Sequence, residues 1–136
     1  MPSNLKQNEI LNILKEKLNN SYSPYSGFQV SSAVETDNGF YFGVNVENSS
    51  FPMTICAESS AITSMICSEG RTKIKQVVIV SSSENLCPPC GACLQRMLEF
   101  STKDTKVLIA NKDLTKKTTC MLEDMIKFKF NSSDFF

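Results

Sequence analysis

Residues 77–80 read VVIV, four consecutive apolar residues with no polar residue between them. An apolar run of this length is typical of a strand that is buried on both faces of a sheet. Residues 107–110 (VLIA) repeat the pattern, and residues 91–100 between the two runs have the pattern of a helix. Strands that alternate with helices in this way predict an α/β fold with a mixed sheet.

A hairpin is expected upstream of these strands. Two β-prone runs, residues 28–36 and 40–46, flank Asp37-Asn38-Gly39. Asn and Gly both tolerate positive φ, and Asn-Gly between two such runs is a strong hairpin signal. The hairpin therefore supplies an antiparallel part to the predicted sheet.

Three further helices are expected around the sheet. Apolar residues recur at helical spacing over residues 4–19. A second helix is predicted over residues 56–68, with Gly70 as its stop signal, and a last one over residues 121–127. Because the chain shows no linker and no internal repeat, residues 1–136 are predicted to form a single domain.

The composition excludes several classes of protein. Its 14 basic and 14 acidic residues give a net charge of zero, which argues against a nucleic-acid polymer and suits a small uncharged ligand. No run of about 18 apolar residues exists, so no membrane partner is expected. The six cysteines, without a signal-peptide pattern, predict a reducing cytoplasm. The absence of histidine excludes His-assisted hydrolases and zinc sites with imidazole ligands.

Two cysteine clusters indicate a zinc site. Cys56 begins one predicted helix, and Cys90 and Cys93 lie one turn apart at the start of another, so their sulfurs can face one ion. Three thiolates leave the fourth position of a tetrahedral Zn²⁺ open to water, which is the mark of a catalytic zinc site. Glu58, two residues after Cys56, is the predicted catalytic residue that moves protons.

Cys87 leaves an alternative open. The segment Cys87-Pro88-Pro89-Cys90 also has the Cys-x-x-Cys spacing, so Cys87 could be the fourth ligand of a closed, structural zinc site. The chain would then be a non-enzymatic zinc module that is stabilised by its metal and used for binding.

Four motifs in this order resemble those of the zinc-dependent cytidine deaminases. They are residues 23–28 (SPYSGF), 43–48 (GVNVEN), 56–58 (CAE) and 89–93 (PCGAC). The chain is similar to the small, homotetrameric type of this family. The resemblance implies a three-layer α/β/α fold with a mixed five-stranded sheet, a Zn²⁺ cofactor, and hydrolysis of cytidine or deoxycytidine to uridine or deoxyuridine and ammonia in pyrimidine salvage.

The same resemblance implies substrate-binding residues outside the zinc cluster. Asn45 and Glu47, two residues apart on one face of a strand, would bind the sugar hydroxyls. Phe28 would stack on the pyrimidine. The Ala57 N–H would contact the base carbonyl, and the Pro88 carbonyl would accept a hydrogen bond from the leaving amine.

Three positions depart from the family pattern. Ser59 and Leu94 stand where arginines are usual, so the negative charge of the thiolates would be less compensated. Lys127 stands where proline is usual, shortly before Phe130, which resembles the aromatic residue that a neighbouring subunit donates. The altered zinc surroundings leave room for another cytosine-containing substrate, such as the antibiotic blasticidin S, although the sugar-binding pair favours an ordinary nucleoside.

Overall fold

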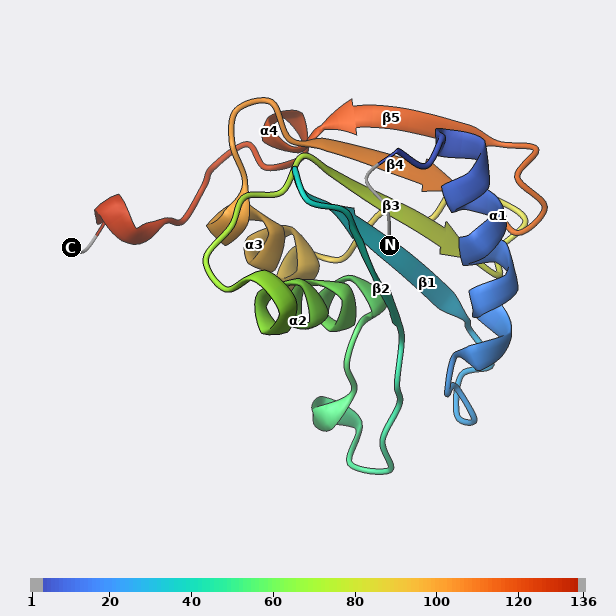
Figure 1. The fold of residues 1–136 in the computed structure, drawn as a ribbon. Coiled ribbons are helices and arrows are strands. Elements are labelled where there is room, and N and C mark those ends of the chain that lie inside the picture. Colours follow the sequence, from blue (N-terminus) through green and yellow to red (C-terminus); the bar gives the residue numbers. More distant parts are fainter. Residues whose placement is uncertain (1–3, 135–136) are drawn as a thin grey trace.

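A five-stranded mixed sheet lies at the centre of the protein (Figure 1). In the computed structural model, which describes residues 4–134, the strands follow the order β2-β1-β3-β4-β5. The strands are β1 (Val30–Glu35), β2 (Phe40–Val44), β3 (Gln76–Ser81), β4 (Lys106–Ala110) and β5 (Lys117–Met121). The helices are α1 (Gln7–Lys17), α2 (Ala57–Glu69), α3 (Gly91–Phe100) and α4 (Leu122–Met125), with 3₁₀ turns at Leu18–Asn20, Phe51–Met53 and Ser132–Asp134.

The hairpin and the strands that alternate with helices form as the sequence predicts. β1 and β2 are antiparallel around residues 36–39, with Glu35 opposite Phe40. β3 and β4 are parallel neighbours with α3 between them in the chain, and the other neighbouring pairs are antiparallel. The predicted α/β class with a mixed sheet is therefore confirmed. Boundaries of these elements differ from the predicted ones by a few residues at most.

Helices cover both faces of the sheet, and each face has its own apolar core. α1 packs on one face, and α2, α3 and α4 pack on the other (Figure 1). Val78 and Val80 of β3 face α1, whereas Val77 and Ile79 face α2 and α3. Both faces of β3 are thus apolar because both are buried, and each such side chain contributes about 1.5–3 kcal/mol. The three-layer α/β/α arrangement is confirmed.

β5 is the strand that no pattern in the sequence predicted. Its residues, KTTCM, are mostly exposed and do not alternate between apolar and polar. The strand forms because it pairs antiparallel with β4, with Met121 opposite Lys106. The helix predicted over residues 121–127 is therefore wrong in extent, since Met121 still belongs to β5 and α4 ends at Met125.

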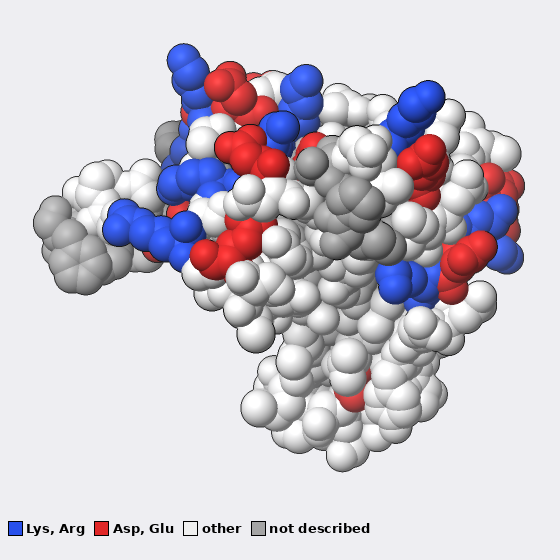
Figure 2. Space-filling view, viewed as in Figure 1, with Lys and Arg blue, Asp and Glu red and all other residues white. Residues whose placement is uncertain are grey.

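Residues 46–55 form an arm that extends away from the sheet (Figure 1). Backbone hydrogen bonds of 2.9 Å join Val46 and Ile55 in both directions and close its base. Phe51 and Met53 near its tip are 60% and 65% exposed. The lower part of the surface in Figure 2 is nearly free of charged side chains, whereas Lys, Arg, Asp and Glu are frequent above it. The arm therefore presents apolar surface that the single chain does not bury.

The close contact between α2 and β2 depends on Gly43. A Cβ atom at this position would lie 2.4 Å from the Ala61 nitrogen and 2.5 Å from the Ala57 oxygen, both backbone atoms of α2. Because backbone atoms cannot move aside as a side chain can, only glycine allows the helix to lie this near the strand. The contact holds the first turn of α2, which carries Glu58, against the sheet.

Replacing Gly43 is expected to destabilise the fold. We predict that Gly43→Ala lowers the free energy of unfolding by about 2 kcal/mol or more, because α2 must shift to admit the methyl group. Urea titration followed by circular dichroism measures this change. Gly91→Ala is the matched control, since a Cβ at Gly91 meets nothing within 4 Å. Equal losses in the two variants would contradict the role given to Gly43.

Candidate functional site

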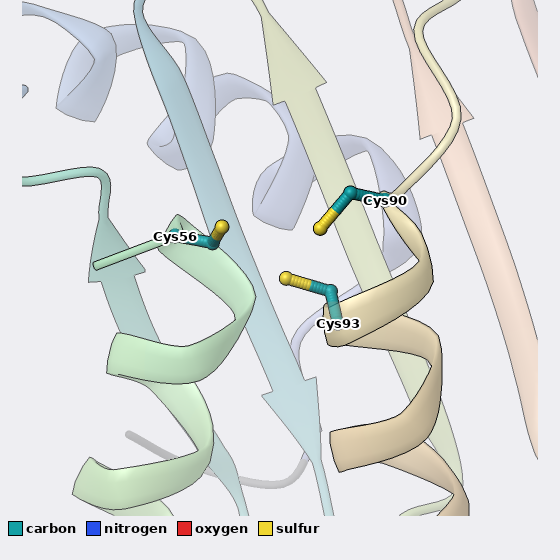
Figure 3. Close-up of side chains that lie close together, drawn as sticks. All are labelled: Cys56, Cys90 and Cys93. Carbon is teal, nitrogen blue, oxygen red and sulfur yellow. The ribbon is translucent and has the colours of Figure 1, made fainter. Parts of the chain in front are cut away.

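Two helix N-termini bring three cysteines together. Cys56 is the N-cap residue of α2 and Cys90 that of α3, each with extended backbone, and Cys93 lies in the first turn of α3. Their sulfur atoms all lie within 4.8 Å of one another, and the three side chains point toward a common space between the helices (Figure 3). The structure thus assembles the cysteines of both predicted clusters.

The three sulfurs suit a zinc ion. Burial raises the pKa of the Cys56 and Cys93 thiols, and the nearby Glu58 raises the pKa of Cys93 further. The pKa of Cys90 is lowered despite burial, because backbone N–H groups at the start of α3 donate hydrogen bonds to its sulfur. A divalent cation stabilises thiolates that burial and mutual repulsion otherwise disfavour. Zn–S bonds of about 2.3 Å place tetrahedral ligands about 3.8 Å apart, which small side-chain rotations reach from the present spacing.

Glu58 is buried beside these sulfurs. It is the second residue of α2, is 5% exposed, and its Oε2 accepts a hydrogen bond of 3.4 Å from the Cys93 sulfur. Burial raises the pKa of its carboxyl, so the group keeps a proton at a higher pH than an exposed glutamate. A buried carboxyl with a raised pKa can accept a proton and return it.

A cavity of about 210 Å³ opens beside the sulfurs and Glu58. Among the residues that the sequence predicted for the site, those that line it are Phe28, Asn45, Cys56, Ala57, Glu58, Pro88 and Cys90. The other lining residues are Val30, Thr54, Ile55, Ile79, Ser81, Cys87 and Pro89. Apolar walls with a few converging polar groups are typical of a small-molecule site.

Asn45 and Glu47 both hold the loop that precedes β1. The Asn45 Oδ1 accepts a hydrogen bond of 2.9 Å from the Val30 N–H, and its Nδ2 donates one of 2.8 Å to the Phe28 carbonyl. Glu47 is 5% exposed and accepts hydrogen bonds of 3.0 and 3.1 Å from the backbone of residues 25–26. Asn45 lines the cavity, whereas Glu47 lies under the loop and is not among the described lining residues.

Phe130 lies outside the cavity of its own chain. It is 60% exposed, on the C-terminal segment that leaves the body of the protein after α4 (Figure 1). Its carbonyl accepts a hydrogen bond of 2.8 Å from the Gln95 side chain on α3. Within one described chain, Phe130 is therefore not brought to the three cysteines.

Several lining residues were missed by sequence reasoning. Ile79 and Ser81 line the cavity because alternate residues of a strand face the same side, and this side of β3 faces α2. The strand predicted over residues 77–80 implies that alternate residues share a face. The sequence does not show which of its two faces borders the cysteines. Thr54 and Ile55 belong to the cavity because they directly precede Cys56.

Cationic side chains are absent from the described lining of the cavity. Ser59 and Leu94 place no charge near the sulfurs, and Arg96 lies with Ser59 along a separate groove between α2 and α3. Among the described residues around the cavity, positive potential at the thiolates therefore comes from the N-terminal ends of α2 and α3, through their backbone N–H groups and dipoles.

Comparisons with a family model and with known proteins all lead to cytidine deaminases. A family model described as the cytidine and deoxycytidylate deaminase zinc-binding region matches residues 5–109. A cytidine deaminase of Mycoplasma genitalium is 42% identical over 109 residues, which cover 79% of this chain and 83% of that protein. A cytidine deaminase of Mycoplasma pneumoniae is 38% identical over 105 residues, which cover 76% of this chain and 79% of that protein.

Solved structures agree with these relatives. A crystal structure of cytidine deaminase from Burkholderia pseudomallei superposes with a TM-score of 0.85 at 27% identity, covering 93% of this chain and all of that one. The structure of the Bacillus anthracis cytidine deaminase, at 16% identity and a TM-score of 0.70, covers 93% of this chain and 91% of that one and shows a likeness of fold.

The cysteine geometry predicts which thiols bind zinc. X-ray absorption of the zinc-loaded protein is expected to show three sulfur neighbours and one light atom, because the Cys87 sulfur lies outside the group of three. Cys93→Ser should weaken zinc binding about 100-fold or more, measured by competition with a chromophoric chelator. Cys87→Ser is the matched control and should bind zinc as the unaltered chain does. Four sulfur neighbours, reduced to three by Cys87→Ser, would instead indicate a closed structural site.

Proposed function

The chain belongs to the cytidine and deoxycytidylate deaminase family, and we propose that it is a zinc-dependent deaminase that hydrolyses cytidine and deoxycytidine to uridine and deoxyuridine. Ammonia is the second product. The observation that carries this proposal is the meeting of three cysteine sulfurs and a buried glutamate at one cavity. This arrangement provides a metal site and a proton carrier at the same wall.

Cys56, Cys90 and Cys93 hold the zinc in this proposal, and Glu58 handles the protons. A zinc ion held there would supply Lewis acidity, which lowers the pKa of water and so makes it a better nucleophile at neutral pH. Glu58 takes a proton during the attack and returns it to the departing amine, a role that suits a buried carboxyl with a raised pKa. Its position in the first turn of α2 keeps it at the cavity wall, beside the sulfurs.

The cavity walls orient the substrate. Phe28 offers an aromatic ring for stacking on the pyrimidine, and Asn45 faces the cavity with an amide for the sugar hydroxyls. The Ala57 N–H belongs to the first turn of α2, where helical N–H groups have no partner within the helix, so it is available to the base carbonyl. The Pro88 carbonyl lies at the same cavity and can accept a hydrogen bond from the departing amine.

An uncharged nucleoside fits this site better than a nucleotide. None of the described lining residues is Lys or Arg, so a 5′-phosphate would meet no cation there. Glu47, which we propose as the second sugar-binding residue, would also repel a phosphate placed near the sugar. A larger cytosine-containing substrate such as blasticidin S is the second candidate, motivated by Ser59 in place of the usual arginine.

We further propose a homotetramer in which neighbouring copies complete the site. The apolar arm at residues 46–55 leaves Phe51 and Met53 exposed, and a second copy of the chain would cover them. Phe130 lies outside its own cavity on a segment that leaves the body of the protein, which suits its donation to a neighbouring cavity.

The proposed setting is pyrimidine salvage in the cytoplasm. All six cysteines have free thiols, which suits a reducing compartment. Within residues 4–134, none of the helices has the length and apolar character that a bilayer-crossing helix needs.

Removing the carboxylate of Glu58 tests the chemistry. We predict that Glu58→Gln lowers kcat for cytidine by about 1,000-fold, because the amide cannot carry the proton, while zinc content stays unchanged. Turnover is followed by the fall in ultraviolet absorbance as cytidine becomes uridine. Full activity of Glu58→Gln would exclude the proposed proton route. If the unaltered, zinc-loaded protein deaminates blasticidin S but not cytidine or deoxycytidine, the second candidate is correct.

The quaternary proposal predicts both a mass and a kinetic effect. Light scattering should give four times the 15.1 kDa chain mass, and Met53→Lys should lower that mass because it places a charge on the apolar arm. Phe130→Ala should raise KM for cytidine while leaving kcat within about threefold, since it removes a wall of the cavity and no reacting group. A monomeric, fully active protein would contradict both parts.

A further inference from the structure

The hydroxyl of Ser26 joins Glu47 to the backbone of Phe28. Its Oγ donates a hydrogen bond of 2.5 Å to the Glu47 Oε2 and accepts one of 3.0 Å from the Phe28 N–H. One hydroxyl thus connects a proposed sugar-binding carboxylate with the residue that lines the base side of the cavity.

The donors around Glu47 leave it one unused acceptor direction. A carboxylate has about four lone-pair sites, two on each oxygen. Oε1 accepts the N–H groups of Tyr25 and Ser26 at 3.0 and 3.1 Å, and Oε2 accepts the Ser26 hydroxyl. Three sites are therefore filled from the loop, and the remaining one lies on Oε2. The lone pairs lie in the plane of the carboxylate, and the Ser26 hydroxyl together with the two N–H groups holds that plane, so these donors also determine where the last lone pair points.

Phe28 is held from both sides by the same pair of polar residues. Its N–H is connected to Glu47 through Ser26, and its carbonyl accepts a hydrogen bond of 2.8 Å from Asn45. The intervening Gly27 has φ of +70°, a left-handed conformation that glycine adopts without strain, and it allows the Ser26 hydroxyl to turn back to the Phe28 N–H.

We propose that Ser26 is a positioning residue for sugar recognition, which aims the free acceptor of Glu47 at a sugar hydroxyl and ties it to the Phe28 backbone. The inference rests on the proposed nucleoside deaminase function. The described hydrogen bonds of the Ser26 hydroxyl go to Glu47 and to the Phe28 N–H, and none goes to the three cysteines or to Glu58. Its effect is therefore on substrate binding and not on the chemical step. The lowered pKa of Glu47, whose largest cause is the Ser26 hydroxyl, agrees with this contact.

The experiment compares Ser26→Ala with the unaltered protein on two substrates. Cytidine carries both sugar hydroxyls, and 2′,3′-dideoxycytidine carries neither. Ser26→Ala is expected to raise KM for cytidine about tenfold with kcat within about twofold, and to change KM for the dideoxy substrate less than about threefold. Ser26→Thr, which keeps a hydroxyl, should restore the KM for cytidine. An equal rise in KM for both substrates, or a fall of kcat alone, would overturn the proposal.

Ser23→Ala is the matched control in the same loop. The Ser23 hydroxyl accepts a hydrogen bond of 3.3 Å from Ser21, whereas the hydrogen bonds described for Glu47 come from Tyr25 and Ser26, so loss of the Ser23 hydroxyl should leave both KM values within about twofold. A Ser23→Ala variant that behaves as Ser26→Ala does would indicate general loosening of the loop and would overturn the proposal.

A second measurement separates this inference from the deaminase function. Carbon-13 nuclear magnetic resonance of the side-chain carboxyl can follow the titration of Glu47 in the full chain. Ser26→Ala should raise its midpoint toward that of an ordinary glutamate, and Ser26→Thr should not. An unchanged midpoint would overturn the proposed contact even if cytidine is turned over. If the unaltered protein does not turn over cytidine, the deaminase function fails, while this titration still tests the contact.

Discussion

The site depends on holding three cysteine sulfurs and the Glu58 carboxyl, all of which can ionise, within a few ångströms of one another. When ionised these groups repel one another, and burial adds to the cost of ionising them. The chain meets this requirement by starting two helices at the same place, so that both helix N-termini face the sulfurs. A bound cation then completes the compensation. The positions of α2 and α3 against the sheet are therefore the condition on which the rest of the site depends.

The sheet positions the N-termini of α2 and α3 in two different ways. α2 lies against β2, where Gly43 leaves room for the helix backbone. α3 follows the loop after β3 and leads into the parallel strand β4, so its N-terminus lies at the end of β3 that borders the cavity. In parallel arrangements of this kind, ligands bind beyond the carboxyl ends of the strands. The location of the cavity is thus a consequence of topology, and the cysteines add the chemistry.

The polar residues of the cavity wall have structural partners as well as a proposed ligand. The Asn45 amide hydrogen-bonds to the Phe28 carbonyl and to the Val30 N–H, on either side of Gln29. The Glu47 carboxylate accepts hydrogen bonds from the backbone N–H groups of residues 25–26 in the preceding loop. Buried polar groups of this kind are stable only when they are hydrogen-bonded, so the loop and the proposed sugar contacts share one network. Loss of a hydrogen-bond partner of Asn45 or Glu47 is therefore expected to act on binding even when the altered side chain faces away from the zinc.

The sequence by itself determined the elements whose signals are local. The VVIV and VLIA runs, the Asn-Gly hairpin, and the cysteines at two helix starts could each be recognised because a few neighbouring residues define them. Tertiary structure alone decided the rest. β5 forms because its backbone pairs with β4. Glu47 is buried by a loop that starts more than twenty residues earlier, and Phe130 lies outside the cavity of its own chain. These features depend on contacts between segments that are distant in the sequence, so a local pattern of residues does not predict them.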